Sequence, residues 1–339
     1  MDSDPQIVLK TKYVLLTRAM YDALRSKKTS VPFSIDDAIR SGKENPDSSM
    51  GVYAGAPVSY DELGQLFEGA IAKYHNFNAD EKHVSNMDSN LNLMDLDPTG
   101  ERVISTRIRV GRNLAGFPFA PIITREQRAE VERKVVEVLN MLEGDLAGEY
   151  FSLENMPEDV RARLVADHFL FKKGDQYLES AGANRDWPAS RGIFHNPAKT
   201  FLVWVNEEDQ LRIISMQPGG NVQEVFARLA KAVNMLEQKL GFAQHERYGY
   251  LSSCPTNLGT AMRASVHIRI PKVSQRADFK EFCVSLGLSV RGIDGEHSES
   301  KGGIYDISNT RRLGLSEADG VRLVYEGVRQ LLAEEYGLN

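Results

Sequence analysis

The stretch 261–270 constrains this chain more than any other, because its polar and apolar side chains alternate strictly from Met262 onward. Such alternation predicts a strand with one face on a hydrophobic core. One face carries Arg263, Ser265, His267 and Arg269, and the other face is aliphatic. A face with two arginines and a histidine must meet water, a partner or an anion. This strand therefore marks a candidate binding site.

Arginines recur on other predicted strands. A second strand repeats the layout with Ser105, Arg107 and Arg109 on one face, and Arg212 begins the return strand of a hairpin predicted over 200–216. Arginines on separate strands would repel one another unless an anion lay between them. The planar guanidinium suits phosphate oxygens and keeps its charge, so the pattern predicts a polyphosphate site.

Two loops accompany these strands. Cys254 opens a turn-forming segment that contains Pro255 and Gly259. A small buried core cysteine and a functional thiol are both consistent with this position. The second loop, over 291–303, is polar and rich in glycine, which is typical of loops that close over ligands.

Three further residues are interpreted as structural. Glu207 and Asp209 are predicted to be solvated charges at the tip of the hairpin, because exposed acidic residues are common in turns. Cys283 lies on the apolar side of a helix predicted over 278–286, which indicates a packed core thiol.

Length and composition exclude several classes of protein. The chain has 339 residues, 42% of them apolar, which is enough for a large core and two domains. Its net charge of −6 gives no general attraction to nucleic acid or to acidic membranes. We find no signal peptide and no apolar run near the roughly 20 residues of a membrane helix. The two cysteines lie in unrelated contexts and indicate no disulfide framework, so we expect a cytoplasmic protein. From the charge and the lack of a membrane helix we expect no nucleic-acid or membrane partner.

The chain divides into a small all-α domain over 1–85, a linker over 86–100 and a larger domain over 101–339. No strand is predicted in the first domain. Its helices are predicted over 11–28 and after a capping box at 59–62. The larger domain mixes hairpins with helices that begin at Thr124, Val222 and Ser316, the second of them ending at Gly241. This order predicts an α+β fold on an antiparallel sheet.

The common nucleotide-binding motifs are missing from the sequence. There is no GxxxxGK[ST] loop, no GxGxxG turn between strand and helix, and no HRD or DFG set. Arginine side chains would then have to neutralise the phosphates. No spacing of His, Cys, Asp and Glu predicts a metal held by the protein, so we expect Mg²⁺ to arrive with ATP or ADP.

The motifs together resemble the phosphagen kinases (ATP:guanidino phosphotransferases), and the arginine kinases most of all. The matching segments are STRIR at 105–109, RGIFHN at 191–196, NEEDQLR at 206–212, CPTNLGT at 254–260, RASVHIRIP at 263–271, RGIDGEH at 291–297 and YDISNTRRLG at 305–314. The N-terminal part matches more loosely.

This resemblance implies a small helical domain, a larger domain on an eight-stranded antiparallel sheet, and reversible transfer of the ATP γ-phosphoryl group to a guanidino nitrogen. By motif position it assigns phosphate binding to Arg107, Arg109, Arg212, Arg263 and Arg291. It assigns the nucleotide pocket to Ser105, His168, Ser265, His267 and Asp306. It assigns guanidinium contacts to Glu208, Cys254 and Glu296. It assigns the amino-acid end of the substrate to Ser48, Gly51 and Tyr53.

The implied chemistry is physically sound. A guanidinium holds its proton with a pKa above about 12, so it needs alignment and a proton acceptor before it can attack phosphorus. Two carboxylates can grip its fork and accept the proton. A thiolate at Cys254 adds a third negative contact, with ionisation favoured by the Thr256 hydroxyl and by the substrate cation.

The sequence departs from the arginine-kinase pattern at several positions. Gln210 replaces a histidine, which we expect to change a contact at the hairpin tip only. Ser49 and Met50 are bulkier than the residues that arginine kinases usually carry there, in the substrate-specificity loop (residues 48–53). Gln176 stands where many relatives carry an arginine, and so removes an ion pair with the position of Asp47.

Four functions remain open at this point. An arginine kinase is the first, and Tyr74 agrees with arginine over taurocyamine as the substrate. A kinase for taurocyamine or another guanidine is the second. A protein-arginine kinase is the third, against which the loop 48–53 argues. A catalytically inactive nucleotide-binding module is the fourth, against which the set of Glu208, Cys254 and Glu296 argues. We expect a monomer or a homodimer.

Overall fold

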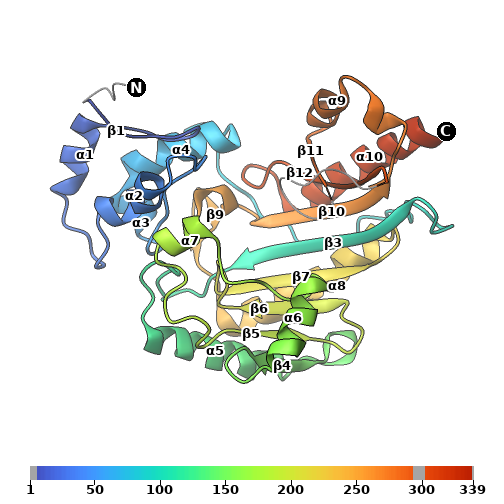
Figure 1. Cartoon of the computed structure of the whole chain (residues 1–339), viewed down its shortest axis with the longest axis horizontal. Helices are drawn as coiled ribbons and strands as arrows, with labels where there is room; N and C mark the ends of the chain where they lie inside the picture. The colour runs from blue at the N-terminus through green and yellow to red at the C-terminus, as the bar shows by residue number, and fades with distance from the viewer. Residues whose placement is uncertain (1–5, 293–301, 338–339) are drawn as a thin grey trace.

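The computed structural model describes residues 6–292 and 302–337. The N-terminal part of the chain is mainly helical, as predicted, and forms the blue lobe of Figure 1. Its helices are α1 (Arg18–Arg25), α2 (Ile35–Glu44), α3 (Ser59–Glu62) and α4 (Gly64–His75).

A short hairpin precedes these helices and was not predicted. It consists of β1 (Ile7–Lys10) and β2 (Leu15–Thr17), so the expectation of a domain without strands is corrected in this detail. The helix predicted over 11–28 begins only after Thr17. The Thr17 hydroxyl accepts a hydrogen bond from the Met20 amide and so caps the helix, while the residues before it pair with β1.

Two predicted capping boxes had different outcomes. The box at Ser59 is wrong, because Ser59 lies inside α3 and its hydroxyl accepts a hydrogen bond from the Ala56 amide. The capping box of α2 is formed instead by Ser34 and Asp37. The box predicted at Thr124 is confirmed at the start of α5.

The C-terminal part is built on an eight-stranded antiparallel sheet, which confirms the predicted fold class (Figure 1). The strand order is β11-β12-β10-β3-β7-β6-β5-β4. The strands are β3 (Val103–Arg112), β4 (Glu149–Ser152), β5 (Gly192–His195), β6 (Phe201–Val205), β7 (Leu211–Pro218), β10 (Met262–Arg269), β11 (Leu288–Arg291) and β12 (Ile304–Asn309). A small separate hairpin pairs β8 (Gln244–His245) with β9 (Gly249–Tyr250).

Helices cover both faces of this sheet. The helices of the C-terminal part are α5 (Arg125–Leu139), α6 (Glu158–Ala166), α8 (Val222–Leu240), α9 (Phe279–Ser285) and α10 (Glu317–Tyr336), together with α7 (Gln176–Ser180), which contacts α2. Val203 of β6 packs in one core with α5, α8 and α10. Its neighbour Trp204 packs in a separate core with Leu164 of α6, because successive strand residues point to opposite faces. The predicted end of α8 at Gly241 and start of α10 at Ser316 are confirmed.

The register of β3 and β10 brings the two predicted polar faces together. The cross-strand pairs are Arg263–Arg109, Ser265–Arg107 and His267–Ser105. The aliphatic residues between them, such as Ile108 and Val266, lie in the core with α8 and α10. The predicted core position of Cys283 is also confirmed, since its side chain is fully buried.

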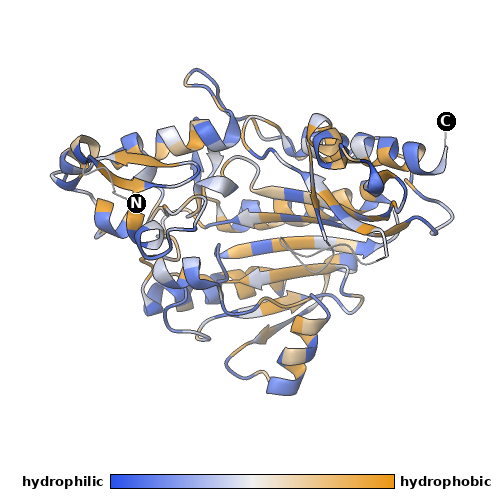
Figure 2. Ribbon diagram, turned by 45° about the horizontal axis from the view of Figure 1, so that its top comes forward, coloured by the Kyte–Doolittle hydropathy of each residue, from blue (hydrophilic) through white to orange (hydrophobic). Residues whose placement is uncertain are grey.

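Residues 76–100 contain no helix or strand. Asp97 anchors the end of this segment by accepting hydrogen bonds from the amides of Arg102 and Val103. Figure 2 shows hydrophobic residues gathered along the strands of the sheet. Within 6–292 and 302–337, no helix is long and apolar enough to cross a membrane.

Candidate active site

Four arginines converge on the polar face of the sheet. Arg107 and Arg109 come from β3, Arg263 comes from β10, and Arg212 lies at the start of β7. The guanidinium carbons of Arg107 and Arg212 lie 5.6 and 5.5 Å from the ring centre of Trp204. The indole thus holds two of the cations on one surface through cation–π contacts.

These arginines repel one another. Burial, and then the charges of Arg212 and Arg263, lower the pKa of Arg107 to about 10. Burial, followed by Arg212 and Arg107, also lowers the pKa of Arg109. Neither Arg107 nor Arg109 forms an ion pair with a residue in the described ranges. A group of cations left in this state favours a bound anion, and four of the five predicted phosphate arginines lie in this group.

The predicted nucleotide-pocket residues form a chain of contacts beside these arginines. Asp306 of β12 pairs with Arg263 at 2.7 Å and lies 3.7 Å from the Nε2 atom of His267. The Nδ1 atom of His267 lies 3.2 Å from the hydroxyl of Ser105. Although burial favours the neutral acid, His267 and Arg263 lower the pKa of Asp306 to about 2. Ser265 is buried and donates a hydrogen bond to the Arg107 carbonyl.

Glu208 occupies the hairpin tip between β6 and β7. Its Oε2 atom lies 3.0 Å from Nη2 of Arg212, and its Oε1 atom accepts a hydrogen bond from the Asn257 amide at 3.3 Å. Burial raises the pKa of Glu208 to about 7, although Arg212 opposes this shift. The carboxylate thus sits between the arginines and the turn that begins at Cys254.

Cys254 is 7% exposed, and its Sγ atom lies 3.1 Å from the Thr256 hydroxyl, which confirms the predicted contact. Burial, and then the negative charge of Glu208, raise the pKa of Cys254 to about 12, and Thr256 lowers it by less. The thiol is therefore protonated at neutral pH as long as no cation lies against it. Asn257 connects this turn to Glu208 and also accepts a hydrogen bond from Arg312.

The prediction that Glu207 and Asp209 are solvated charges is wrong. Asp209 is 3% exposed, and its Oδ1 atom accepts hydrogen bonds from Asn113 at 2.8 Å and Ser252 at 2.7 Å. The Glu207 carboxylate lies 2.9 Å from Arg212. The tip is folded against the protein, so these charges have partners that are remote in sequence.

The prediction for Gln210 is wrong for the same reason. Gln210 is buried, and its side chain donates to the Pro118 carbonyl and accepts from the Leu114 amide. This residue anchors the hairpin to the segment after β3 and makes no contact at an exposed tip.

The N-terminal domain holds the cysteine segment in place. The Ala54 amide donates to the Ser253 carbonyl at 2.8 Å, and the Ser253 hydroxyl donates back to the Ala54 carbonyl at 2.9 Å. The Tyr60 hydroxyl donates to the Ser252 carbonyl at 2.7 Å, and Nε2 of His75 lies 2.8 Å from the Pro255 carbonyl. Sequence reasoning missed Tyr60 and His75, because no local pattern connects them with Cys254.

The predicted specificity loop lies next to this segment. Ser48 and Tyr53 are mostly buried, and burial, followed by the charges of Cys254 and Glu208, raises the pKa of Tyr53. The loop bends at Gly51, where φ is +72° and an added Cβ would lie 2.8 Å from the Cα of Gly42. A side chain at this position is therefore excluded both by backbone conformation and by space.

The two unusual loop residues have different surroundings. Met50 is buried in the N-terminal core, and its carbonyl accepts a hydrogen bond from the Thr11 hydroxyl at 3.1 Å. Ser49 is exposed, and its carbonyl accepts a hydrogen bond from the Tyr13 amide at 3.2 Å. The hairpin at the start of the chain thus holds the backbone of the loop at both residues.

Three further residues, Arg291, His168 and Glu296, were predicted to belong to the site. Arg291 ends β11 and lies opposite Asp306 in the sheet register, which puts it beside the nucleotide-pocket residues. His168 is exposed, with φ +60°, just after α6, and no contact in the described part of the chain links its side chain to this site. Glu296 lies outside the described residues.

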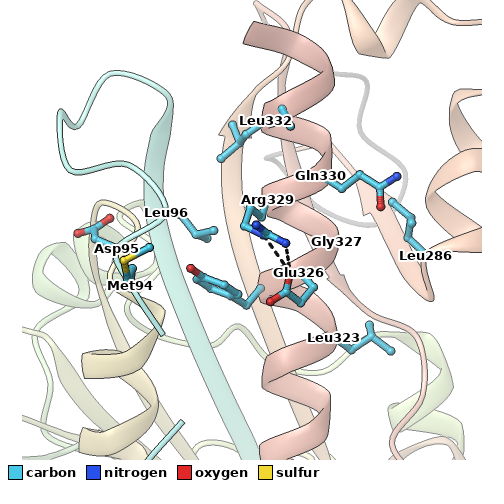
Figure 3. A pocket seen from close by; sticks show the side chains of 12 residues that line it. Met94, Asp95, Leu96, Leu286, Leu323, Glu326, Gly327, Arg329, Gln330 and Leu332 are labelled. Carbon is cyan, nitrogen blue, oxygen red and sulfur yellow. Dashed lines mark hydrogen bonds and ion pairs between the residues drawn. The ribbon is translucent and has the colours of Figure 1, made fainter. Parts of the chain in front are cut away.

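A hollow of about 650 Å³ is found elsewhere, between α10 and residues 94–96. Figure 3 shows Leu323 and Leu332 of α10 beside it, with Arg329 and Glu326 paired to each other. The described residues that line it include none of the predicted site residues. Because α10 covers the aliphatic face, this hollow is separate from the arginine face.

Comparison with known proteins identifies the family. Residues 10–72 match the N-terminal domain of the ATP:guanido phosphotransferases, and residues 130–338 match their C-terminal catalytic domain. The chain therefore belongs to the ATP:guanido phosphotransferase family, and the predicted class of enzyme, a phosphagen kinase, is confirmed.

Several relatives are about 50% identical to this chain over most of its length. It is 52% identical to an arginine kinase of Anthopleura japonica over 94% of this chain and 46% of that protein. It is 48% identical to the arginine kinase Oct f 2 of Amphioctopus fangsiao over 94% of this chain and 92% of that protein. The chain thus spans less than half of the first relative but nearly all of the second.

Solved structures of other guanidino kinases share the fold. A lombricine kinase superimposes with a TM-score of 0.90 and 38% identity, over 96% of this chain and 92% of the other. The duplicated taurocyamine kinase of Schistosoma mansoni superimposes with a TM-score of 0.89 and 43% identity, over 96% of this chain and 45% of the other. Similar folds therefore serve kinases named for different guanidines.

Proposed function

We propose that this protein transfers the γ-phosphoryl group of ATP reversibly to a guanidino nitrogen of L-arginine, giving phosphoarginine and ADP and buffering cellular energy. The observation that carries this proposal is the pair of Arg107 and Arg109, which form no ion pair with a described residue and lie beside Arg212, the partner of the Glu208 carboxylate. The names of the relatives described above support arginine as the substrate.

The arginine face binds the phosphates of the nucleotide. Arg107, Arg109, Arg212 and Arg263 neutralise charge on the transferring group, and they need no rearrangement to do so because the sheet already holds them. Arg291 joins them from β11. Ser105, Ser265, His267 and Asp306 line the nucleotide pocket, and the family pattern adds His168.

Mg²⁺ enters as the complex with ATP or ADP. In the described ranges, no three His, Cys, Asp or Glu side chains are grouped to hold a metal ion. Phosphate oxygens and water are ligands that Mg²⁺ prefers, so the nucleotide itself can carry it. The magnesium ion supplies positive charge to the phosphates, next to that of the arginines.

Glu208 accepts the proton of the attacking nitrogen. The bond from this nitrogen to phosphorus forms while the bond from phosphorus to the ADP oxygen breaks, and the N–H proton passes to the carboxylate. A pKa of about 7 suits such a proton acceptor at neutral pH. Glu296 would supply the second carboxylate by motif position.

Cys254 completes the guanidinium site. Its thiol pKa of about 12 falls when the substrate cation is bound, because an adjacent positive charge stabilises the thiolate. The resulting ion pair aligns the guanidinium for in-line attack. Ser48, Gly51 and Tyr53 contact the amino-acid end of the substrate.

The first test is ADP release from MgATP, measured by a coupled assay, with L-arginine, taurocyamine, creatine, glycocyamine and lombricine offered side by side. We expect the highest kcat/KM with L-arginine. A higher value with taurocyamine would move the proposal to that substrate. Binding of ATP without turnover on any of the five would contradict the proposal and favour a protein substrate or an inactive nucleotide-binding module.

A cytoplasmic location is also proposed, and the state of the cysteines supports it. The two cysteines are free and buried, which suits a reducing compartment. Fractionation of cells that express the protein would test this location.

A further inference from the structure

The two domains are joined by hydrogen bonds between α2 and α7, at the edge of the candidate site. The Tyr177 hydroxyl donates to Oδ2 of Asp47 at 2.8 Å. The Ser41 hydroxyl donates to the Tyr177 carbonyl at 2.9 Å, and the Asn45 amide donates to the Ser180 hydroxyl at 2.8 Å. We call these five residues the α2–α7 clasp. Figure 1 shows α7 at the lower edge of the N-terminal lobe.

The clasp holds one end of the specificity loop. Asp47 directly precedes Ser48, whose amide donates to the Asn45 carbonyl at 3.0 Å. The other end of the loop is held by the bonds between Ala54 and Ser253. Hydrogen bonds therefore connect loop 48–53 to the catalytic domain at both of its ends, through Asp47 at one end and through Ala54, beside the Cys254 segment, at the other.

Tyr177 donates a hydrogen bond to Asp47, the residue that an arginine at position 176 would otherwise pair with. The sequence predicts that Gln176 removes an ion pair with Asp47, and among the described residues no cationic side chain is paired with Asp47. Tyr177 supplies a neutral donor instead. Asp175 fixes the start of α7, because its carboxylate accepts hydrogen bonds from the backbone amides of Tyr177 and Leu178 and so caps the helix.

We propose that Tyr177 is a positioning residue for the guanidino substrate, and that its hydroxyl, through Asp47, fixes the start of loop 48–53 against the catalytic domain. This inference rests on the proposed function. Tyr177 itself is assigned no contact with the nucleotide or the reacting atoms. It acts on the placement of Ser48 and therefore on the affinity for the amino-acid end of the substrate.

The test is Tyr177→Phe, which removes one oxygen atom and keeps the ring. We expect the KM for L-arginine to rise about threefold to tenfold, because one hydrogen bond to a charged group is lost. We expect kcat and the KM for ATP to stay within about twofold, because the arginine face is untouched. The double variant Gln176→Arg/Tyr177→Phe gives Asp47 a cationic partner, and we expect it to restore most of the lost affinity.

The matched control is Tyr21→Phe. The Tyr21 hydroxyl also donates to a carboxylate at 2.8 Å, that of Asp36, but both residues belong to the N-terminal domain. We expect this variant to leave every KM unchanged. An unchanged KM for L-arginine in Tyr177→Phe, or an equal rise in the KM for ATP, would overturn the positioning role.

Amide hydrogen exchange tests the clasp without catalysis. We expect faster exchange over residues 45–51 in Tyr177→Phe and not in Tyr21→Phe. If the wild-type protein turns over no guanidine, the proposed function fails while this readout still reports on the clasp. If the protein is active but exchange over 45–51 is the same in both variants, the clasp does not hold the loop and the inference fails by itself.

Discussion

Two parts of strand β3 carry arginines that differ in whether an acidic side chain neutralises them. Arg112 is fully buried on the side of the core, where its guanidinium pairs with Glu317 at 3.4 Å and donates to the Thr260 carbonyl at 2.8 Å. Its guanidinium carbon lies 3.5 Å from the ring centre of Tyr250. Arg107, five positions earlier, has no acidic partner among the described residues and has a buried Nε atom without a hydrogen bond.

This contrast separates a structural arginine from a functional one. Both residues are the same type on the same strand, and period-two alternation places them on opposite faces without saying which of them has a counter-charge. What differs is whether the protein supplies the counter-charge. Arg112 is neutralised by Glu317, whereas Arg107 and Arg109 form no ion pair with a described residue and leave a cationic surface that a phosphate can neutralise.

The largest expected effect is on stability at the structural pair. Glu317→Gln keeps the shape of the side chain but leaves the charge of Arg112 buried without a partner. We expect a loss of about 3–5 kcal/mol in the free energy of unfolding, measured by urea denaturation, with kcat of the folded fraction near that of the wild type.

A double replacement sharpens this test. Arg112→Met/Glu317→Leu removes both charges, and we expect it to recover most of the lost stability. A loss below about 1 kcal/mol in Glu317→Gln would show that the pair is not the structural element inferred here.

The second prediction concerns the functional arginines. Arg109→Ala removes one oriented cation from the phosphate site, and we expect kcat to fall by about 10²–10³. Because the remaining guanidinium groups then repel one another less, we expect the free energy of unfolding to stay the same or to rise. Coupled ADP release and urea denaturation measure the two effects. A variant that is destabilised but turns over normally would reverse the roles assigned to the two sets of arginines.

The contrast extends to carboxylates and predicts a pH dependence. Burial raises the pKa of Glu208 to about 7, so the carboxylate is mostly protonated below that pH and can neither accept a proton nor bind a cation. We expect kcat/KM to rise with pH through about 7 and to fall nearly tenfold per unit below it. The pH profile of kcat/KM between pH 5.5 and 8.5 measures this. Glu208→Gln should be slow and flat over that range, and a wild-type profile that is flat down to pH 5.5 would contradict the role of Glu208 as the proton acceptor.

Stability responds to this group in the opposite direction. The folded pKa of Glu208 lies above the value of 4.5 that is usual for a free glutamate, so the folded state binds more protons between these two values. Glu208 therefore contributes stability below about pH 4.5 that is lost as the pH rises to about 7. Activity and stability at this residue thus favour different ends of the range.

The smallest effect is expected at the thiol. Thr256→Val removes the hydroxyl that lowers the pKa of Cys254. We expect alkylation of Cys254 by iodoacetamide at pH 9 and the value of kcat each to fall about threefold to tenfold, because the thiolate is the reactive form. The Cys283→Ala background leaves Cys254 as the sole thiol. Faster alkylation in Thr256→Val would show that the hydroxyl does not donate to the sulfur.

The sequence predicted those features that depend on periodicity and on helix ends. The alternation around Arg263 and Arg107 predicted two polar strand faces, and both exist. Thr124 and Ser316 begin helices as their capping chemistry predicts. The hairpin β1–β2 escaped prediction because its strands are only four and three residues long, too short for a period-two pattern to be seen.

The errors at the tip of the β6–β7 hairpin share one cause, which is contact between residues that are far apart in the chain. Asp209 looked like a solvated tip residue, but its partners Asn113 and Ser252 are 96 and 43 positions away. Gln210 was misread in the same way, since Pro118 lies 92 positions from it. Local composition describes a turn correctly and still does not say what the turn packs against.

The sequence by itself determined the α+β fold class, the family and the residue types of the site, because strand alternation, caps and motifs are encoded locally. Only the tertiary structure decided which charges have partners. Arg112 finds Glu317 across 205 positions, and Tyr177 finds Asp47 across 130. Charge compensation depends on distances in space and on burial, and neither quantity can be read from the order of residues along the chain.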